Sequence, residues 1–342
     1  MRLRHAVLLA LIAASVLTIG ARAQQPSSTG APGARSPYVT ADNRPQGWAT
    51  KDYLQNTLGW PANKPLWNTA KQKLLDGKPI RSFSIGQPDP ELYCQMAPHY
   101  DFAWIEMQHS TLSWADVAKL IAACPHVGAT PMIRLADEFE STLQHATDVG
   151  AIGMIEPTVD TVEKAQAVAR YARYPPFGRR SQGGGQAGSL WGINGVNYRQ
   201  EINANMLVTL MIETPTGVAN ALEIARVPGV DVVLAANSDL GNFSGYQPTD
   251  AEYQALVTRI HDATLRAGKF FGCTNAPEGP TARADEADFR MIQNPPKSND
   301  GYMPPARGGR AGAPTTSGAA SPTAPAGGGR GRRGGGAGAP QP

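Results

Sequence analysis

The chain is poor in cysteine. Only Cys94, Cys124 and Cys273 occur among 342 residues, and their spacing matches no cysteine-based metal site. Cys94 and Cys124 fall in two early helical segments, and an oxidising compartment would permit them to pair. Because an odd count leaves one cysteine over, buried thiols without a disulfide are the favoured interpretation.

Apolar runs long enough to cross a membrane are also missing, apart from one borderline case at the N-terminus. Arg2 and Arg4 precede the apolar run 6–20, and Ala21-Arg22-Ala23 forms a small-x-small cleavage site. The run is short for a membrane span, which needs roughly 20 apolar residues. We therefore expect a signal peptide at residues 1–23, export to the periplasm or the medium, and no membrane association after cleavage.

The two ends of the remaining chain have little to bury. Residues 305–342 consist mainly of Gly, Ala, Pro, Ser, Thr and Arg without periodicity, which predicts a disordered tail. Residues 24–48 are similar and are predicted to be a flexible segment. The domain is expected at 49–304, about 250 residues and a typical size for a (β/α)₈ barrel.

The domain lacks the positive charge that nucleic-acid binding requires. The formal net charge is +3. The arginines of the predicted signal and tail carry more positive charge than this, so the domain itself is mildly acidic. The tail arginines have no aromatic residues between them, so a solvated linker is favoured over RNA binding. The arginines concerned are Arg2, Arg4, Arg22, Arg307, Arg310, Arg330, Arg332 and Arg333.

What the domain does contain is a regular alternation of short apolar runs and amphipathic segments, which predicts parallel βαβ units. Eight strands predict a TIM (β/α)₈ barrel with disordered extensions at both ends. No strand or helix fits the segment from 174 to about 190. Strands are expected over residues 80–85, 102–106, 130–134, 152–155, 206–213, 230–235, 270–274 and 289–293. Helices are expected over residues 67–76, 114–123, 138–148, 160–171, 217–225 and 250–267.

Four polar residues follow the apolar runs that predict strands, namely His109, Arg134, Glu213 and Asp239. In a parallel barrel the carboxyl ends of the strands converge on one mouth, where catalytic residues lie. Two carboxylates there would repel each other unless a cation neutralised them, and an all-oxygen site suits Mg²⁺ or Mn²⁺. The alternative is that Glu213 and Asp239 cap the helices that follow them.

His109 and Arg134 have both a catalytic and a structural interpretation. Glu106 precedes His109 by three residues, and its carboxylate would fix the imidazole tautomer and raise the basicity of the ring. Arg134 would stabilise a developing oxyanion, or it would form only a salt bridge with Glu106 or another acid. A lone histidine is more often structural than catalytic.

A lysine placed for Schiff-base chemistry is missing. Lys78 and Lys269 precede strands and so belong to the opposite face of the barrel, while Lys119 and Lys164 fall on helices. Lys297 comes late enough after a strand to reach the mouth, but it lies beyond two prolines. This pattern favours metal chemistry over imine chemistry.

Several motifs are spread over roughly residues 65–295. They are Glu106-Met107-Gln108-His109, Pro131-Met132-Ile133-Arg134, Gly150-Ala151-Ile152-Gly153, residues 157–161, Tyr174-Pro175-Pro176-Phe177-Gly178-Arg179-Arg180, Ile212-Glu213 and residues 236–240. Together these motifs resemble the HpcH/HpaI aldolase family of the phosphoenolpyruvate/pyruvate-binding barrels. The resemblance implies class II aldol chemistry, in which a 4-hydroxy-2-oxo acid is cleaved reversibly to pyruvate and an aldehyde. It also implies assembly as trimers or hexamers.

The resemblance assigns roles by position. Glu213 and Asp239 would hold a divalent ion such as Mg²⁺, Mn²⁺ or Co²⁺. His109, supported by Glu106, would take the proton of the 4-hydroxyl through a water. Arg134 would assist the enolate, and Gln108 and the backbone N–H groups near Ser238 and Asp239 would bind the 2-oxo acid substrate.

Three positions depart from the family pattern: Glu106 replaces an aspartate, Gln108 a glutamate, and Ala236-Asn237 a glycine-proline pair. Because the ligands, base and arginine are all present, an active enzyme is favoured. Two alternatives stay open. One is a lyase or decarboxylase acting on oxaloacetate or a citrate-like substrate, and the other is a non-catalytic exported protein that binds 2-oxo acids.

Overall fold

The computed structural model describes residues 49–183, 185–191, 198–274, 289–295 and 298–302. The predicted signal peptide, the flexible segment 24–48, Lys297 and the tail 305–342 lie outside these residues. Within the described part of the chain, no helix combines the length and apolar character that a membrane span requires.

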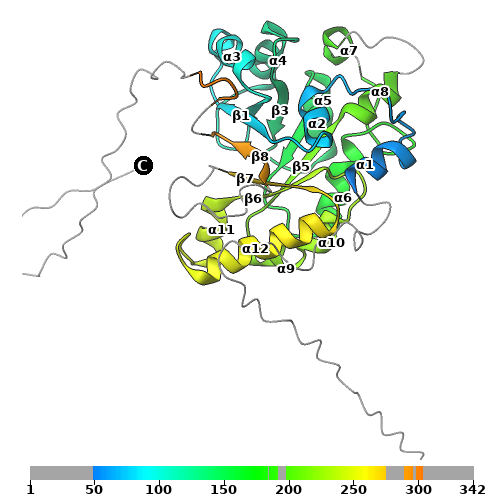
Figure 1. Ribbon diagram of the computed structural model, residues 1–342. Helices are drawn as coiled ribbons and strands as arrows, with labels where there is room; N and C mark the ends of the chain where they lie inside the picture. The colour runs from blue at the N-terminus through cyan, green and yellow to red at the C-terminus, as the bar shows by residue number, and fades with distance from the viewer. Residues whose placement is uncertain (1–48, 184, 192–197, 275–288, 296–297, 303–342) are drawn as a thin grey trace, which may run out of the picture. The chain divides into compact units, whose positions relative to one another are not determined.

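Eight parallel strands form a closed barrel in which each strand pairs with the next and β8 pairs with β1. The TIM barrel prediction is therefore confirmed, and Figure 1 shows helices on the outside of the strands. The predicted strands agree with the structure to within two residues at each end. The strands are β1 Ile80–Ile85, β2 Phe102–Glu106, β3 Thr130–Arg134, β4 Gly153–Glu156, β5 Leu207–Ile212, β6 Val232–Ala235, β7 Phe270–Thr274 and β8 Phe289–Gln293.

Alternation along each strand divides the core into two layers. Met211 on β5 belongs to the cluster that fills the barrel, whereas its neighbour Ile212 packs in the layer between strands and helices. Strands buried on both faces read as continuous apolar runs, and all six residues of β5 are buried. This explains why short apolar runs located the strands.

Side-chain caps define where several of the helices begin. Ser113 and Asp116 form a capping box at α4, and Thr161 and Thr214 cap α6 and α9. The helices and single turns are α1 Thr50–Asp52, η2 Tyr53–Thr57, α2 Thr69–Leu75, α3 Pro90–Met96, η3 Ala97–His99, α4 Trp114–Ala123, α5 Glu140–Asp148, α6 Val162–Tyr171, α7 Ala187–Leu190, α8 Tyr198–Asn205, α9 Pro215–Ala219, α10 Ala221–Ala225, α11 Asn237–Ser244 and α12 Ala251–Arg266.

Two expectations about helices were wrong. The segment from 174 to about 190 contains the short helix α7, and the helix expected over 217–225 is divided at Asn220 into α9 and α10. α7 has the sequence Ala-Gly-Ser-Leu, which is too short and too rich in small residues to show a period.

Buried charges gather where strands β6 and β7 begin. Asp231 lies 3.2 Å from the Nζ of Lys71 and 3.5 Å from Nη2 of Arg173, and all three side chains are at most 1% exposed. Lys269, directly before β7, is also buried, and its Nζ has no hydrogen-bond partner among the described residues. Asp231 is thus the shared counterion of a group with more cations than anions.

This cluster predicts that stability rises with pH above neutrality. Burial lowers the pKa of Lys269 from 10.5 to about 7 and that of Lys71 to about 8, partly opposed by Asp231. Between these values and 10.5 the unfolded chain binds more protons than the folded chain, so the free energy of unfolding increases with pH. We expect denaturant unfolding to show higher stability at pH 9 than at pH 7, and Lys269→Met to flatten the dependence. A fall in stability over this interval would contradict the prediction.

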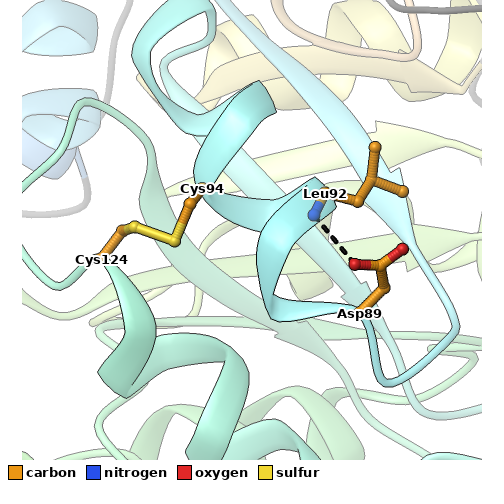
Figure 2. The surroundings of a disulfide bond; sticks show 4 residues. All are labelled: Asp89, Leu92, Cys94 and Cys124. Carbon is orange, nitrogen blue, oxygen red and sulfur yellow. Dashed lines mark hydrogen bonds between the residues drawn. A yellow bond between two sulfur atoms is a disulfide. The ribbon is translucent and has the colours of Figure 1, made fainter.

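A disulfide joins α3 to the end of α4. Cys94 and Cys124 are bonded with a Cα–Cα distance of 5.6 Å, which is normal for a disulfide. Figure 2 shows the bridge beside the start of α3, where Asp89 accepts a hydrogen bond from the backbone N–H of Leu92. The interpretation as separate buried thiols was therefore wrong for this pair, because the barrel places the two helical segments side by side. Cys273 is buried on β7.

Removing the disulfide is expected to lower the free energy of unfolding by about 3–4 kcal/mol, the loop-closure value for this sequence separation. The bond closes a loop between residues 30 positions apart. The measurement is thermal or denaturant unfolding of Cys94→Ala/Cys124→Ala against the oxidised wild type. Reduction of the wild type should give the same loss, and reduction of the variant no further loss. Equal stability of the variant and the oxidised wild type would refute the prediction.

Candidate active site at the mouth of the barrel

The residues expected at the mouth come from four strands. Glu106 and Arg134 end β2 and β3 and are paired in register, so their side chains start from adjacent positions. Glu213 directly follows β5, and Asp239 lies in the first turn of α11, the helix that follows β6. The fold therefore brings these residues to the carboxyl ends of the strands, as the sequence predicted.

Arg134 lies between two carboxylates. Its Nη1 is 3.2 Å from Oε2 of Glu106, and its Nη2 is 3.6 Å from Oε1 of Glu213. The side chain is 10% exposed, and its guanidinium is 6.0 Å from the ring centre of Trp104 inside the barrel. The expected salt bridge with Glu106 is present, but the contact with Glu213 places the same guanidinium beside the candidate metal ligand.

Glu213 is almost completely buried, with 1% of its surface exposed. Its Oε2 accepts two hydrogen bonds from Thr158, one from the backbone N at 2.9 Å and one from Oγ1 at 2.6 Å. Its Oε1 is buried and has no hydrogen-bond partner among the described residues. Burial raises the pKa of the Glu213 carboxyl, and the negative charge of Asp239 adds to this rise. The hydrogen bonds from Thr158 and the positive charge of Arg134 oppose it.

The helix that carries Asp239 is held by Asn237. The backbone N and the Nδ2 of Asn237 donate to Oγ1 and O of Thr274 at 2.8 and 2.7 Å, and the Tyr253 hydroxyl donates to the Asn237 carbonyl at 3.0 Å. These bonds fasten the start of α11 to β7 and α12. Ser238 and Asp239 lie in the first turn, where backbone N–H groups have no acceptor within the helix.

The alternative role of the two carboxylates as helix caps finds no support. Thr214, not Glu213, caps α9 through a hydrogen bond from the backbone N of Gly217. The N-cap position of α11 is Ala236, and no side chain caps this helix. The carboxylates of Glu213 and Asp239 are therefore not used in helix capping.

Glu106 contacts His109 differently from the expectation. Its Oε1 accepts from the backbone N–H groups of Gln108 and His109 at 2.9 and 3.1 Å, and its Oε2 from Trp104 Nε1 at 3.2 Å. No hydrogen bond joins this carboxylate to the His109 imidazole, which is exposed. The longer side chain folds back over its own loop, so Glu106 fixes the backbone of this loop and the guanidinium of Arg134.

The residues present suit a divalent cation. The described part of the chain holds no group of three or more His, Cys, Asp or Glu side chains arranged for a metal ion. Glu213 and Asp239 are two oxygen donors, and Mg²⁺ is commonly bound by one or two carboxylates together with water and substrate. The unsatisfied Oε1 of Glu213 is an available ligand atom, so the donor set fits Mg²⁺ or Mn²⁺.

Three buried polar atoms around this position have no hydrogen-bond partner in the described structure. They are Oε1 of Gln108, Nε of Arg134 and Oε1 of Glu213. Buried polar groups in folded proteins are nearly always satisfied. Their residues follow β2, end β3 and follow β5, so the mouth offers both donors and acceptors to a polar ligand.

Lys119 and Lys164 lie on helices and Lys78 and Lys269 precede strands, as the sequence predicted. Among the described residues, no lysine follows the carboxyl end of a strand. Lys164 lies on α6, 3.0 Å from the buried carboxylate of Glu156, which points outward from β4. The described part of the barrel mouth thus has no candidate for a Schiff base.

Comparison with known proteins identifies the family of this chain. The model of the family described as HpcH/HpaI aldolase/citrate lyase matches residues 92–276, more than half of the chain. The chain belongs to this family. The match covers all strands of the mouth that carry Glu106, Arg134, Glu213 and Asp239.

Several curated relatives of this HpcH/HpaI family member are named as aldolases. The 2-dehydro-3,6-dideoxy-6-sulfogluconate aldolase of Pseudomonas putida is 31% identical over 169 residues, 49% of this chain and 65% of that protein, slightly less than two thirds of its length. The hydroxypyruvate/pyruvate aldolase of Delftia acidovorans is 31% identical over 56% of this chain and 72% of its own. A crystal structure of a family protein from Burkholderia cenocepacia shares 25% identity and a TM-score of 0.61, covering 67% of this chain and 92% of that chain.

Sequence reasoning placed Thr158 only in the motif 157–161 and assigned no role to it or to Asn237. Thr158 has a backbone φ of +49°, which a β-branched residue rarely adopts, so nothing in the residue type pointed to it. Asn237 was noticed only as a departure from a glycine-proline pair. Both act through hydrogen bonds to segments distant in sequence, which only the fold reveals.

Proposed function

We propose that the protein is a divalent-metal-dependent carbon–carbon lyase that cleaves a 4-hydroxy-2-oxo acid to pyruvate and an aldehyde. The observation that carries this proposal is the buried Glu213 beside Arg134, with its Oε1 unsatisfied, at the mouth where Asp239 begins α11 after β6. Relatives named as aldolases of 2-oxo acids support the same reaction class.

Each residue at the mouth has a role in this reaction. Glu213 and Asp239 would hold the ion, which supplies Lewis-acid stabilisation of the charge that develops on the 2-oxo group. The Nε of Arg134 is a donor available to the same developing charge. The N–H groups of Ser238 and Asp239, at the positive end of α11, bind the substrate carboxylate, and Gln108 offers a further polar contact.

Cleavage also requires a base for the 4-hydroxyl proton. We assign this role to His109, because its imidazole is exposed in the loop after β2 and a histidine ring can accept a proton. The ring takes the proton through a water while the C3–C4 bond breaks, so that C4 becomes the aldehyde carbonyl. The electron pair of the bond passes to the pyruvate part as its enolate, and a proton then returns to C3. Glu106 serves this step by holding the backbone of the His109 loop and the guanidinium of Arg134.

We also propose export and self-assembly. The disulfide between Cys94 and Cys124 supports an oxidising compartment, which agrees with the predicted signal peptide. Fractionation of a producing cell tests the location. Family membership supports a homo-oligomer, a trimer or hexamer, which light scattering of the purified protein tests.

The test of function is pyruvate release by the chelator-treated protein. A panel of 4-hydroxy-2-oxo acids and oxaloacetate is incubated with and without Mg²⁺, Mn²⁺ or Co²⁺, and pyruvate is followed with a coupled dehydrogenase. We expect release from a 4-hydroxy-2-oxo acid only with metal. Release from oxaloacetate alone would identify a decarboxylase instead.

A binding protein without catalysis gives a different result. It would bind pyruvate or oxalate without metal, equally well in the wild type, Glu213→Ala and Asp239→Ala, and would release no pyruvate from any substrate. That combination would overturn the assignment.

A further inference from the structure

Thr158 has an unusual backbone next to the candidate metal site. It follows Pro157 after β4, and its φ of +49° lies in the left-handed region. A β-branched side chain is strained there, and such strain costs about 1–3 kcal/mol unless the surroundings enforce it. Strained residues of this kind gather at functional sites, where the surrounding structure enforces them.

The surroundings hold the loop directly after Thr158. The backbone N of Val159 donates to the Met211 carbonyl on β5 at 3.0 Å. The Asp160 carboxylate accepts a hydrogen bond from Oγ1 of Thr214 at 2.5 Å. The backbone carbonyl of Asp160 accepts one from Nδ2 of Asn220 at 2.7 Å. These bonds attach the loop after β4 to the segment after β5, which is the segment that carries Glu213.

In this position Thr158 donates two hydrogen bonds to the same carboxylate oxygen of Glu213. Both the N–H and the hydroxyl of Thr158 donate to Oε2 of Glu213, while Oε1 receives no hydrogen bond among the described residues. Two donors from one rigid residue fix the rotamer of the carboxylate. They also occupy one oxygen and leave the other available on the side of Arg134.

We propose that Thr158 is the positioning residue of the candidate metal site, holding Oε2 of Glu213 so that Oε1 is presented to a divalent cation. This inference rests on the proposed function, because it takes Glu213 as a metal ligand. Groups that orient metal ligands through hydrogen bonds typically contribute 10–100-fold to metal affinity or activity.

The test is Mn²⁺ affinity, measured by calorimetry or electron paramagnetic resonance on the otherwise intact protein. Thr158→Val keeps the shape and removes the hydroxyl, and we expect it to weaken Mn²⁺ binding about 10–100-fold. Thr158→Ser keeps the hydroxyl and is expected to bind within about threefold of the wild type, by the same reasoning. The matched control is Thr161→Val, which removes a threonine hydroxyl at the N-cap of α6 in the same loop region.

Thermal unfolding of the metal-free variants separates positioning from general damage. Thr161→Val should lower stability by about 1 kcal/mol, as loss of a cap does, and leave the Mn²⁺ affinity unchanged. Thr158→Val should change Mn²⁺ affinity by more than its stability change accounts for, and serine should rescue it. Equal Mn²⁺ affinity in Thr158→Val and the wild type, with binding still abolished by Glu213→Ala, would overturn this inference alone. Absence of Glu213-dependent Mn²⁺ binding in the wild type would overturn both this inference and the proposed function.

Discussion

Replacing Glu213 by glutamine is expected to lower kcat/KM by about 10³-fold or more and to abolish measurable Mn²⁺ binding. Glutamine has nearly the same shape, and its carbonyl oxygen can still accept the bonds from Thr158 that Oε2 accepts in the wild type. The variant loses the negative charge, which is what a divalent ion requires from one of only two carboxylate ligands. Loss of Lewis-acid stabilisation costs several kcal/mol of transition-state free energy, which corresponds to this decrease in rate.

The control for this experiment is Glu163→Gln, which removes a carboxylate from the exposed surface of α6. It should bind Mn²⁺ and turn over substrate like the wild type. Asp239→Asn should resemble Glu213→Gln, because both carboxylates are assigned to the same ion. Wild-type Mn²⁺ affinity and turnover in Glu213→Gln would show that this carboxylate is structural.

Replacing Asp231 by asparagine is expected to destabilise the barrel by about 3–5 kcal/mol, the usual cost of removing one partner from a buried ion pair. The carboxylate is completely buried and faces Lys71 and Arg173, and its Oδ2 also accepts from the backbone N of Val208 at 2.9 Å. Without its charge, buried cations lose their shared counterion. The melting temperature should fall by roughly 10 °C, given about 2–4 °C per kcal/mol for a domain of this size.

A second substitution keeps this prediction testable where the single variant is too unstable to purify. Lys269→Met removes a buried amine that has no hydrogen-bond partner among the described residues. In the double variant, Lys269→Met should restore part of the stability lost in Asp231→Asn, because it removes one of the buried cations left without a counterion. The two changes act on one charge cluster and are therefore not additive. Glu140→Gln, which affects only the exposed pair with Arg179, should change stability by less than about 1 kcal/mol. An Asp231→Asn variant as stable as the Glu140→Gln control would contradict the account of the cluster.

The strands were predictable because their signal is local. A strand buried on both faces is a short apolar run, and each of the eight predicted strands is a strand of the barrel. α11 was not predicted, since Asn-Ser-Asp-Leu-Gly-Asn-Phe-Ser contains poor helix formers and no apolar period. Its helix depends on Asn237 being fastened to β7 and α12, a tertiary effect.

The site was predictable only in part, because some of its contacts depend on tertiary structure and not on local sequence. The positions of Arg134, Glu213 and Asp239 follow from strand ends, which the sequence shows. Side-chain rotamers decide that Glu106 accepts from a backbone N–H and not from the imidazole of His109. They also decide that Thr158 donates its hydroxyl hydrogen bond to Glu213. The disulfide likewise depends on which helices the barrel makes neighbours, so the count of cysteines was a poor guide to it.

The most direct test of the central claim is a crystal structure of the protein soaked with Mn²⁺ and oxalate, with anomalous diffraction measured to locate the metal. We predict one anomalous peak at the barrel mouth, within coordination distance of Oε1 of Glu213 and the carboxylate of Asp239, with oxalate completing the coordination. Oxalate bound at the mouth with no anomalous peak between these two carboxylates would contradict the assignment of a metal-dependent lyase.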